Sequence, residues 1–454
     1  MIPLPRQYTP LEGTLDLTAL PFTGPPAIAE LLAELGFPVA GEWIADNTFG
    51  EEAYWLRADQ SGLKVRGRLS GLRWAVQTLR SGTASAWQSC EIHDAPRYSW
   101  RGSLLDVARW HLPIEFLHRY VDLMALHKLN RLHLHLTDDQ GWRFEVKRYP
   151  RLTTVGGFRR ESMRGHYYNF AFDGTPHGGF YTQHELKNLV AYAKRRGVEI
   201  MPEIDLPGHT QAAIAAYPQI GFENVEVSTM WGIHDQVLNT KDATVEFIKH
   251  VLDEVVEVFP FEYVHLGGDE VRSLQWQHSP AAQARADSVG DLLGWWIGTL
   301  ATHLASHGRK TAVWDELLDA DPPEGLLFFG WRDVTRAPAA RAAGYDAVSC
   351  PHEHCYFDWS EGFRPGEPTA INGFVPLERV YRFEPGEVTG VQGQLWTEYL
   401  PTPALVEYRA FPRLAALAEV GWSQAPKDFA GFKDRLRAHL SLLDSLNVNY
   451  RPVD

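Results

Sequence analysis

From Ser103 onward, short runs of apolar and β-branched residues alternate with longer segments whose apolar residues recur every three or four positions. The short runs predict buried strands, and the longer periodicity predicts amphipathic helices that pack on a sheet. Eight strands are expected, at residues 103–108, 131–136, 198–205, 263–268, 311–316, 326–331, 346–350 and 390–396. Because eight parallel strands with intervening helices can close on themselves, the pattern favours an α/β fold of the (β/α)8 TIM barrel type over an open doubly wound sheet.

The pattern before residue 99 is different, with mixed strands and one amphipathic helix predicted at residues 70–82. Pro96 and the polar residues around it interrupt the periodicity in "HDAPRYSW". We therefore expect a small α+β domain over residues 1–98 and the barrel over residues 99–454. A long loop rich in glycine and aromatic residues is expected at about 137–181, and loops of that length in a compact domain are usually functional.

Composition narrows the class of partner. The 454-residue chain is 44% hydrophobic and 22% charged, with a formal net charge of −14. Such a negative chain is expected to bind neither nucleic acid nor an anionic membrane, and a neutral or cationic small ligand is favoured. The sequence begins with no basic segment followed by an apolar run, and its three cysteines form no CxxC pair. These features predict a cytoplasmic protein and leave its oligomeric state open.

Polar residues and tryptophans gather where the predicted strands end. Asp106 and Arg109 follow the first strand, and the later strands run into "TDDQGW", "EIDLPGH", "GGDE", "WDE", Trp331, "PHEHCYFDW" and "LWTE". The active sites of TIM barrels lie at the carboxyl ends of the strands. Solvated loops would account for the carboxylates but not for the tryptophans beside them. Because tryptophan faces stack on pyranose rings while carboxylates and arginine bind hydroxyls, we expect a site that cleaves a glycosidic bond.

Asp269 and Glu270 are adjacent carboxylates that follow a predicted strand and two glycines. Neighbouring residues of an extended backbone point in different directions. The two residues therefore cannot serve as the proton donor and the nucleophile of the usual two-carboxylate glycosidase. A different division of tasks is required if both take part in the reaction.

Several motifs of this chain, in this order, resemble glycoside hydrolase family 20, the β-N-acetylhexosaminidases. They are "RGSLLDVAR", "HLHLTDDQGWR", "PEIDLPGHT", "HLGGDE", "WDE" and "LWTE", and the resemblance extends from about Gly71 to Ser423. It implies an exo-acting enzyme, without a cofactor, that removes terminal non-reducing β-linked N-acetylglucosamine or N-acetylgalactosamine from a glycan or glycoconjugate. It also implies a retaining, substrate-assisted mechanism, in which the oxygen of the 2-acetamido group attacks the anomeric carbon and an oxazolinium intermediate forms.

The resemblance implies a role for each matching residue. Glu270 corresponds to the general acid/base, and Asp269 to the carboxylate that holds the 2-acetamido nitrogen. The other matching residues are Arg101, Asp358 and Glu398 on the ring hydroxyls, Trp314, Trp331 and Trp396 around the acetamido group, Tyr356 on the acetamido oxygen, and Asp138, His209 and Asp205 behind the acid/base.

Two other functions fit parts of the sequence. His133 and His135 lie on one face of a predicted strand, as ligand pairs do in metal-dependent hydrolases of the amidohydrolase kind. That class also requires a later lysine or histidine at a strand end and an aspartate after the last strand, where this chain has "LWTE". A lectin-like barrel would be expected to have lost one of the adjacent carboxylates, and both are present. The spacing in "PHEHC" at 351–355 fits no closed zinc site, so no metal is expected.

Overall fold

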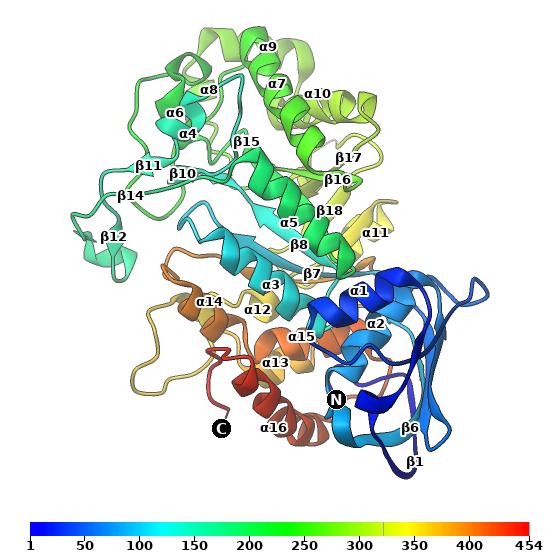
Figure 1. Cartoon of the computed structure of the whole chain (residues 1–454). Helices are drawn as coiled ribbons and strands as arrows, with labels where there is room; N and C mark the ends of the chain where they lie inside the picture. The colour runs from blue at the N-terminus through cyan, green and yellow to red at the C-terminus, as the bar shows by residue number, and fades with distance from the viewer. Residues whose placement is uncertain (321, 454) are drawn as a thin grey trace.

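The computed structural model describes residues 1–320 and 322–453. Eight parallel strands close into a barrel in the order β15-β16-β17-β18-β19-β22-β7-β8, with helices around it (Figure 1). The barrel strands are β7 (Trp100–Asp106), β8 (Arg131–His135), β15 (Glu199–Leu206), β16 (Tyr263–Gly267), β17 (Lys310–Trp314), β18 (Leu327–Gly330), β19 (Asp346–Ser349) and β22 (Gly390–Leu395). Each overlaps one of the eight predicted strands, so the prediction of a TIM barrel is confirmed.

The barrel strands are buried over nearly their whole length because helices or side chains cover both of their faces. Leu104, Leu132, Val264 and Phe328 are completely buried and belong to one continuous hydrophobic core. The larger helices that carry the rest of this core are α3 (Ile114–Leu126), α5 (Gln183–Arg195), α7 (Asp242–Val258), α10 (Leu292–Ser306), α15 (Arg413–Trp422) and α16 (Phe429–Ser445).

Shorter elements lie in the connections of the barrel. The strands among them are β9 (Thr137–Asp138), β10 (Gly141–Trp142), β11 (Phe158–Arg159), β12 (Met163–Arg164), β13 (Ala171–Phe172), β14 (His177–Gly178), β20 (Trp359–Ser360) and β21 (Ile371–Phe374). The helices are α4 (Arg151–Thr154), α6 (Gln211–Ala216), α8 (Leu274–Gln277), α9 (Pro280–Val289), α11 (Arg336–Ala342), α12 (His352–Cys355), α13 (Leu377–Tyr381) and α14 (Pro403–Ala410). The elaborate connections are therefore those after β8, β15, β16 and β19, and they follow the carboxyl ends of these strands.

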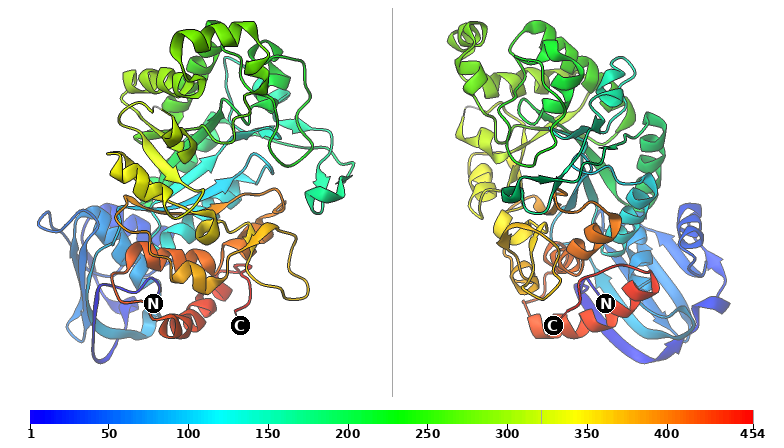
Figure 2. Two further views of the ribbon diagram at one scale, coloured as in Figure 1. Left: turned by 180° about the vertical axis from the view of Figure 1, so that it is seen from behind. Right: turned by 90° about the vertical axis from the view of Figure 1, so that its left-hand side faces the viewer.

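The N-terminal part folds around its own mixed sheet of six strands, in the order β1-β6-β4-β5-β3-β2. Its elements are β1 (Gln7–Leu15), β2 (Phe22–Thr23), α1 (Pro26–Glu34), β3 (Gly41–Ala45), β4 (Tyr54–Asp59), β5 (Gly62–Gly67), α2 (Leu69–Leu79) and β6 (Trp87–Asp94). Figure 2 shows this sheet at the same end of the molecule as the C-terminal helix α16. The predicted small α+β domain is thus present, while its boundary at residue 98 stays a prediction.

Buried charges join this domain to the amino ends of the barrel strands. The guanidinium of Arg101 donates to Glu52 over 2.7 and 3.0 Å, and the Lys128 ammonium lies 2.7 Å from the Asp94 carboxylate. Trp422 of α15 belongs to the hydrophobic cluster of the N-terminal domain and donates its indole N–H to Asp94. Because removal of one partner would leave a buried charge uncompensated, these contacts fix the domain against the barrel.

None of the helices in residues 1–320 and 322–453 is long and apolar enough to cross a membrane. The cytoplasmic location stays a prediction.

Candidate active site

A cavity of about 610 Å³ opens at the carboxyl ends of the barrel strands. This volume lies in the range of small-molecule sites. The predicted site residues that line it are Asp138, His209, Asp269, Glu270, Trp314, Trp331, Tyr356, Asp358, Trp396 and Glu398. They end or follow every barrel strand except β7, and Arg109 lines the cavity in the segment after β7. The fold therefore brings residues far apart in the sequence to one concave surface.

Glycine geometry at the end of β16 places the adjacent carboxylates. Gly267 and Gly268 have φ angles of 71° and 93°, and a Cβ atom on Gly267 would lie 1.7 Å from Oδ1 of Asp205. Glu270 itself has a φ of 50°, which is unusual for a residue with a side chain. Backbone strain of this kind persists where the surrounding structure imposes it, and it is frequent in active sites. The bend allows Asp269 and Glu270 to line the same cavity, which an extended strand would not.

Asp269 is a buried carboxylate with an oxygen free to accept a hydrogen bond from a ligand. It is 9% exposed, and its Oδ1 atom has no hydrogen-bond partner among the described residues. Burial raises the pKa of Asp269 to about 7. Asp205 lies behind it, outside the cavity lining, and burial and the neighbouring Asp269 raise the pKa of Asp205 well above its usual range. A ligand N–H would satisfy the unpaired oxygen and stabilise the ionised form of Asp269.

His209 connects Glu270 to the buried acids. Its Nε2 atom is 3.5 Å from Oε2 of Glu270, and its Nδ1 atom is 3.2 Å from Oδ1 of Asp138. Although burial opposes a charge on this imidazole, the negative charge of Asp138 and hydrogen bonds to the surrounding carboxylates raise its pKa well above the ordinary value. A cationic His209 can therefore stabilise Glu270 as a carboxylate and fix its position.

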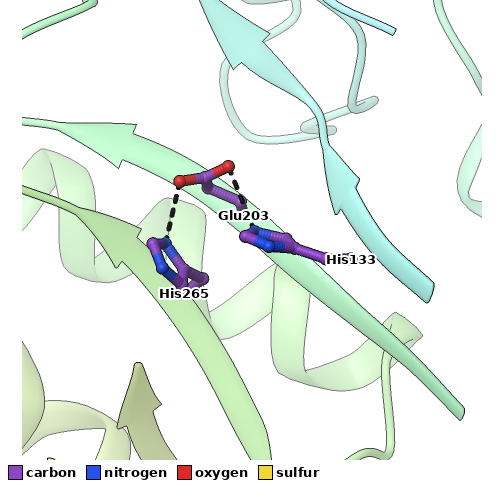
Figure 3. A group of neighbouring side chains, drawn as sticks. All are labelled: His133, Glu203 and His265. Carbon is purple, nitrogen blue, oxygen red and sulfur yellow. Dashed lines mark ion pairs between the residues drawn. The ribbon is translucent and has the colours of Figure 1, made fainter. Parts of the chain in front are cut away.

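Glu203 is the centre of a second buried group, beneath the cavity. Figure 3 shows His133 and His265 on either side of its carboxylate, with His133 Nε2 3.1 Å from Oε2 and His265 Nδ1 2.8 Å from Oε1. His135 also pairs with Glu203 and places its Nε2 atom 2.9 Å from Asp138. The indole N–H of Trp314 donates to Glu203 over 2.9 Å.

The two histidines of "HLHL" are therefore committed to hydrogen bonds and ion pairs in the barrel interior. Three potential metal ligands do converge at His133, Glu203 and His265. However, His135 and Trp314 already occupy the Glu203 oxygens whose lone pairs an ion would need. The arrangement fits a network that positions Asp138 and Trp314 better than it fits a metal centre.

Arg101 does not reach the cavity. It is the second residue of β7, a strand of seven residues, at the end opposite to the active site, and its guanidinium is buried against Glu52, Trp74 and Trp422. The expectation that Arg101 binds the ring hydroxyls is therefore wrong, because Arg101 lies far from the cavity. Arg109, which follows the other end of β7, lines the cavity. The strand-end pattern had already singled out Arg109, so the sequence contained the signal.

Arg109 is bound within a cluster of carboxylates. Its Nη2 atom is 2.9 Å from Asp138 and 3.9 Å from Glu398, and its Nη1 atom is 3.2 Å from Asp106. Its guanidinium also lies over the Trp396 ring, 5.2 Å from the ring centroid. These contacts hold a planar, multidentate donor at the cavity wall, as the recognition of sugar hydroxyls requires.

Aromatic rings form the remaining wall. The ring centroids of Trp314 and Trp396 are 5.9 Å apart, and Trp331 stacks on Tyr356 at 6.0 Å. The Trp331 indole donates to Glu316, a carboxylate whose pKa burial raises to about 8. Such flat apolar surfaces beside buried carboxylates are suited to a sugar ring.

The structure adds cavity residues that the sequence pattern did not assign. They are Tyr167, Trp231, Arg272, His352, Trp359, Ile371 and Tyr399. They lie in loops and short elements that follow the barrel strands, and these segments have no hydrophobic period from which a position can be predicted. Tyr167 falls within the long loop that was predicted to be functional, but nothing in the sequence distinguished it from its aromatic neighbours.

A closed parallel barrel with paired carboxylates, a multidentate arginine and tryptophan walls at its carboxyl end defines a glycoside hydrolase of the TIM-barrel type. The chain belongs to glycoside hydrolase family 20, because residues 98–425 match the description "Glycosyl hydrolase family 20, catalytic domain". The resemblance found in the sequence is thus confirmed, and the amidohydrolase alternative is not supported.

Individual relatives agree with this assignment. A β-hexosaminidase of Porphyromonas gingivalis is 36% identical over 433 residues, which cover 88% of this chain and 54% of that protein. A β-hexosaminidase of Akkermansia muciniphila is 32% identical over 464 residues, or 95% of this chain and 91% of that protein. The chain thus spans about half the length of the first relative and nearly all of the second.

Solved structures show the same fold. An exo-β-N-acetylglucosaminidase of Vibrio harveyi in complex with N-acetylglucosamine has a TM-score of 0.89 and 31% identity, covering 100% of this chain and 78% of that chain. A family 20 β-N-acetylhexosaminidase of Streptomyces coelicolor has a TM-score of 0.87 and 29% identity, covering 100% and 97%.

Proposed function

We propose that this chain is an exo-acting β-N-acetylhexosaminidase that removes terminal non-reducing β-linked N-acetylglucosamine or N-acetylgalactosamine from glycans or glycoconjugates. The observation that carries the proposal is the unpaired, buried oxygen of Asp269 beside Glu270 in an aromatic cavity. An acetamido N–H supplies the donor that this oxygen lacks, whereas a plain sugar hydroxyl at the same position has no carbonyl oxygen with which to assist the reaction.

The reaction begins with a proton transfer from Glu270 to the glycosidic oxygen as the bond from this oxygen to the anomeric carbon breaks. The carbonyl oxygen of the 2-acetamido group attacks the anomeric carbon from the opposite face and closes an oxazolinium ring. Asp269 binds the ring N–H, where positive charge develops, so its interaction is strongest after the attack. Glu270, now a carboxylate held by His209, takes a proton from the water that opens the ring. Two inversions at the anomeric carbon retain its configuration.

The other residues bind and orient the terminal sugar. Arg109, Asp358 and Glu398 face the ring hydroxyls, and the tryptophans enclose the acetamido group. Burial raises the pKa of Tyr356 well above its usual value, so its hydroxyl stays protonated and can donate to the acetamido oxygen. Arg109 and Asp358 are each only 6% exposed. A sugar that reaches these buried groups must be the end of its chain, which supports exo action.

Hydrolysis of two aryl β-glycosides tests the proposal. The 4-nitrophenyl glycoside of N-acetylglucosamine and that of glucose differ only in the group at carbon 2. The acetamido substrate is expected to react while the glucoside stays almost untouched, because only the former carries the internal nucleophile. Similar kcat/KM values for the two substrates would contradict the proposal.

A further inference from the structure

Two histidines and an aspartate converge at the contact between α7 and α10, which pack side by side (Figure 1). Asp253 belongs to α7, and His303 lies in the last turn of α10. His307 is the C-cap residue of α10. Because residues four apart lie on the same side of a helix, His303 and His307 both face the aspartate. None of the three lines the catalytic cavity.

The three side chains direct their ligand atoms to one point. The Nε2 atom of His303 is 2.8 Å from Oδ1 of Asp253, and the Nε2 atom of His307 is 3.1 Å from the same oxygen. The two imidazole centroids are 4.9 Å apart. A zinc ion binds imidazole nitrogen and carboxylate oxygen at roughly 2.0–2.2 Å in a tetrahedron, which separates neighbouring ligand atoms by about 3.4 Å. The observed distances therefore require an opening of only a few tenths of an ångström.

The surroundings leave room for an ion. The side chains of His303, His307 and Asp253 are 18%, 38% and 40% exposed, so water can reach the site and complete the coordination. Glu246 lies close enough to His303 for their charges to interact, and it adds negative potential. The nearby cations have other partners, because Lys249 pairs with Glu246 and Arg309 donates to the Val256 carbonyl oxygen.

The contrast with the barrel interior supports this choice of site. At Glu203 the carboxylate also receives the Trp314 indole and His135, which leaves no open coordination position. Among the described residues, the Asp253 carboxylate pairs only with the two imidazoles, and a metal ion would replace just the two protons that they share with the carboxylate.

We propose that Asp253, His303 and His307 bind one divalent transition-metal ion of the zinc type at the contact between α7 and α10. Imidazole and carboxylate ligands suit zinc, cobalt, nickel and copper ions and do not suit magnesium. Three protein ligands with an exposed remaining position would connect the two helices outside the catalytic cavity. The ion would stabilise the fold, because it binds the assembled ligands and not the separated ones of the unfolded chain.

Calorimetric titration with zinc chloride tests the site. The full chain is used without a histidine tag, after treatment with a chelator and transfer to a buffer free of phosphate. The wild type is compared with the double variant His303→Gln/His307→Gln and with Asp253→Asn. His278→Gln, which removes another exposed histidine, is the matched control. Glu270→Gln is a control for zinc that binds in the catalytic cavity, where His209, Asp269 and Glu270 lie close together.

One equivalent of zinc is expected to bind the wild type and both control variants. The affinity for zinc should fall by at least about tenfold in Asp253→Asn, because loss of even a residue that only hydrogen-bonds to a metal ligand lowers metal affinity by about that factor. Zinc binding should be lost in the double variant. Zinc should raise the thermal midpoint of the wild type but not that of the double variant, whose hydrolytic activity should be unchanged. Absence of binding to the wild type, or equal binding to the correctly folded double variant, would overturn the proposal.

Discussion

Arg101 lies near the start of β7 and Arg109 follows its end, and the structure gives the two arginines different roles. Arg109 faces the cavity among Asp106, Asp138 and Glu398, whereas Arg101 joins the barrel to Glu52 of the N-terminal domain. We therefore expect Arg109→Lys to impair catalysis and Arg101→Lys to impair stability. Lysine is the appropriate substitution because it keeps the charge among the buried carboxylates but loses the planar fork.

The magnitude follows from the hydrogen bonds that the fork supplies. Hydrogen bonds to charged groups contribute roughly 1.5–3 kcal/mol, and 1.4 kcal/mol corresponds to a factor of ten. Arg109→Lys should thus lower kcat/KM on the 4-nitrophenyl N-acetylglucosaminide by about 10- to 100-fold. Arg101→Lys should keep kcat/KM within a few-fold of the wild-type value. It should lower the free energy of unfolding, but by less than the roughly 3–5 kcal/mol that complete removal of one partner of a buried ion pair costs.

Initial rates and thermal unfolding of both variants test which arginine serves catalysis and which serves stability. Circular dichroism at the assay temperature serves as the control that each variant is folded. A large loss of activity in a folded Arg101→Lys variant, with Arg109→Lys near the wild type, would refute the placement of the sugar at Arg109.

Two other predictions concern the paired carboxylates. Glu270→Gln should lose activity by about 10²–10⁴-fold, the range of general acid–base catalysis, and should lose least on substrates whose leaving group needs no proton; an equal loss on good and poor leaving groups would argue against its acid role. The pKa of Asp269, raised by burial to about 7, should make N-acetylglucosamine bind more tightly as pH rises from 6 to 8, because the amide N–H prefers the ionised carboxylate. Titration calorimetry should show a gain of about five- to tenfold, because the ionised fraction of Asp269 rises from about one tenth to about nine tenths and the charged form gains roughly 1.5–3 kcal/mol from the hydrogen bond; Asp269→Asn should lose this gain. A wild-type affinity that falls over this interval would contradict the assignment.

The barrel was predictable from sequence because its strands are buried on both faces and therefore contrast sharply with the amphipathic helices between them. The strand ends then identified most of the cavity wall, since the topology of a closed barrel brings all of them together. The motif around Arg101 was misread because the "RGSLLDVAR" segment has an arginine at each end. Only the direction of β7 shows which one lines the cavity.

Loop residues such as Trp231 and Tyr399 could not be placed, because their position depends on tertiary contacts and not on a periodic pattern. The electrostatics of the site were hidden for a similar reason. The sequence shows that Asp269 and Glu270 are neighbours. It does not show that burial raises the pKa of Asp269, or that Asp205 lies directly behind this residue.

The central claim is that the substrate's own acetamido oxygen attacks the anomeric carbon. The most direct measurement is kcat/KM for aryl N-acyl-β-glucosaminides whose acetyl group carries no, one, two or three fluorine atoms. Each fluorine withdraws electrons from the carbonyl oxygen and weakens it as a nucleophile, with little change in size. We predict a steep, progressive fall in kcat/KM along the series, since the loss enters the transition state directly. A nearly constant kcat/KM across the four substrates would show that a residue of the enzyme, and not the acetamido group, is the nucleophile.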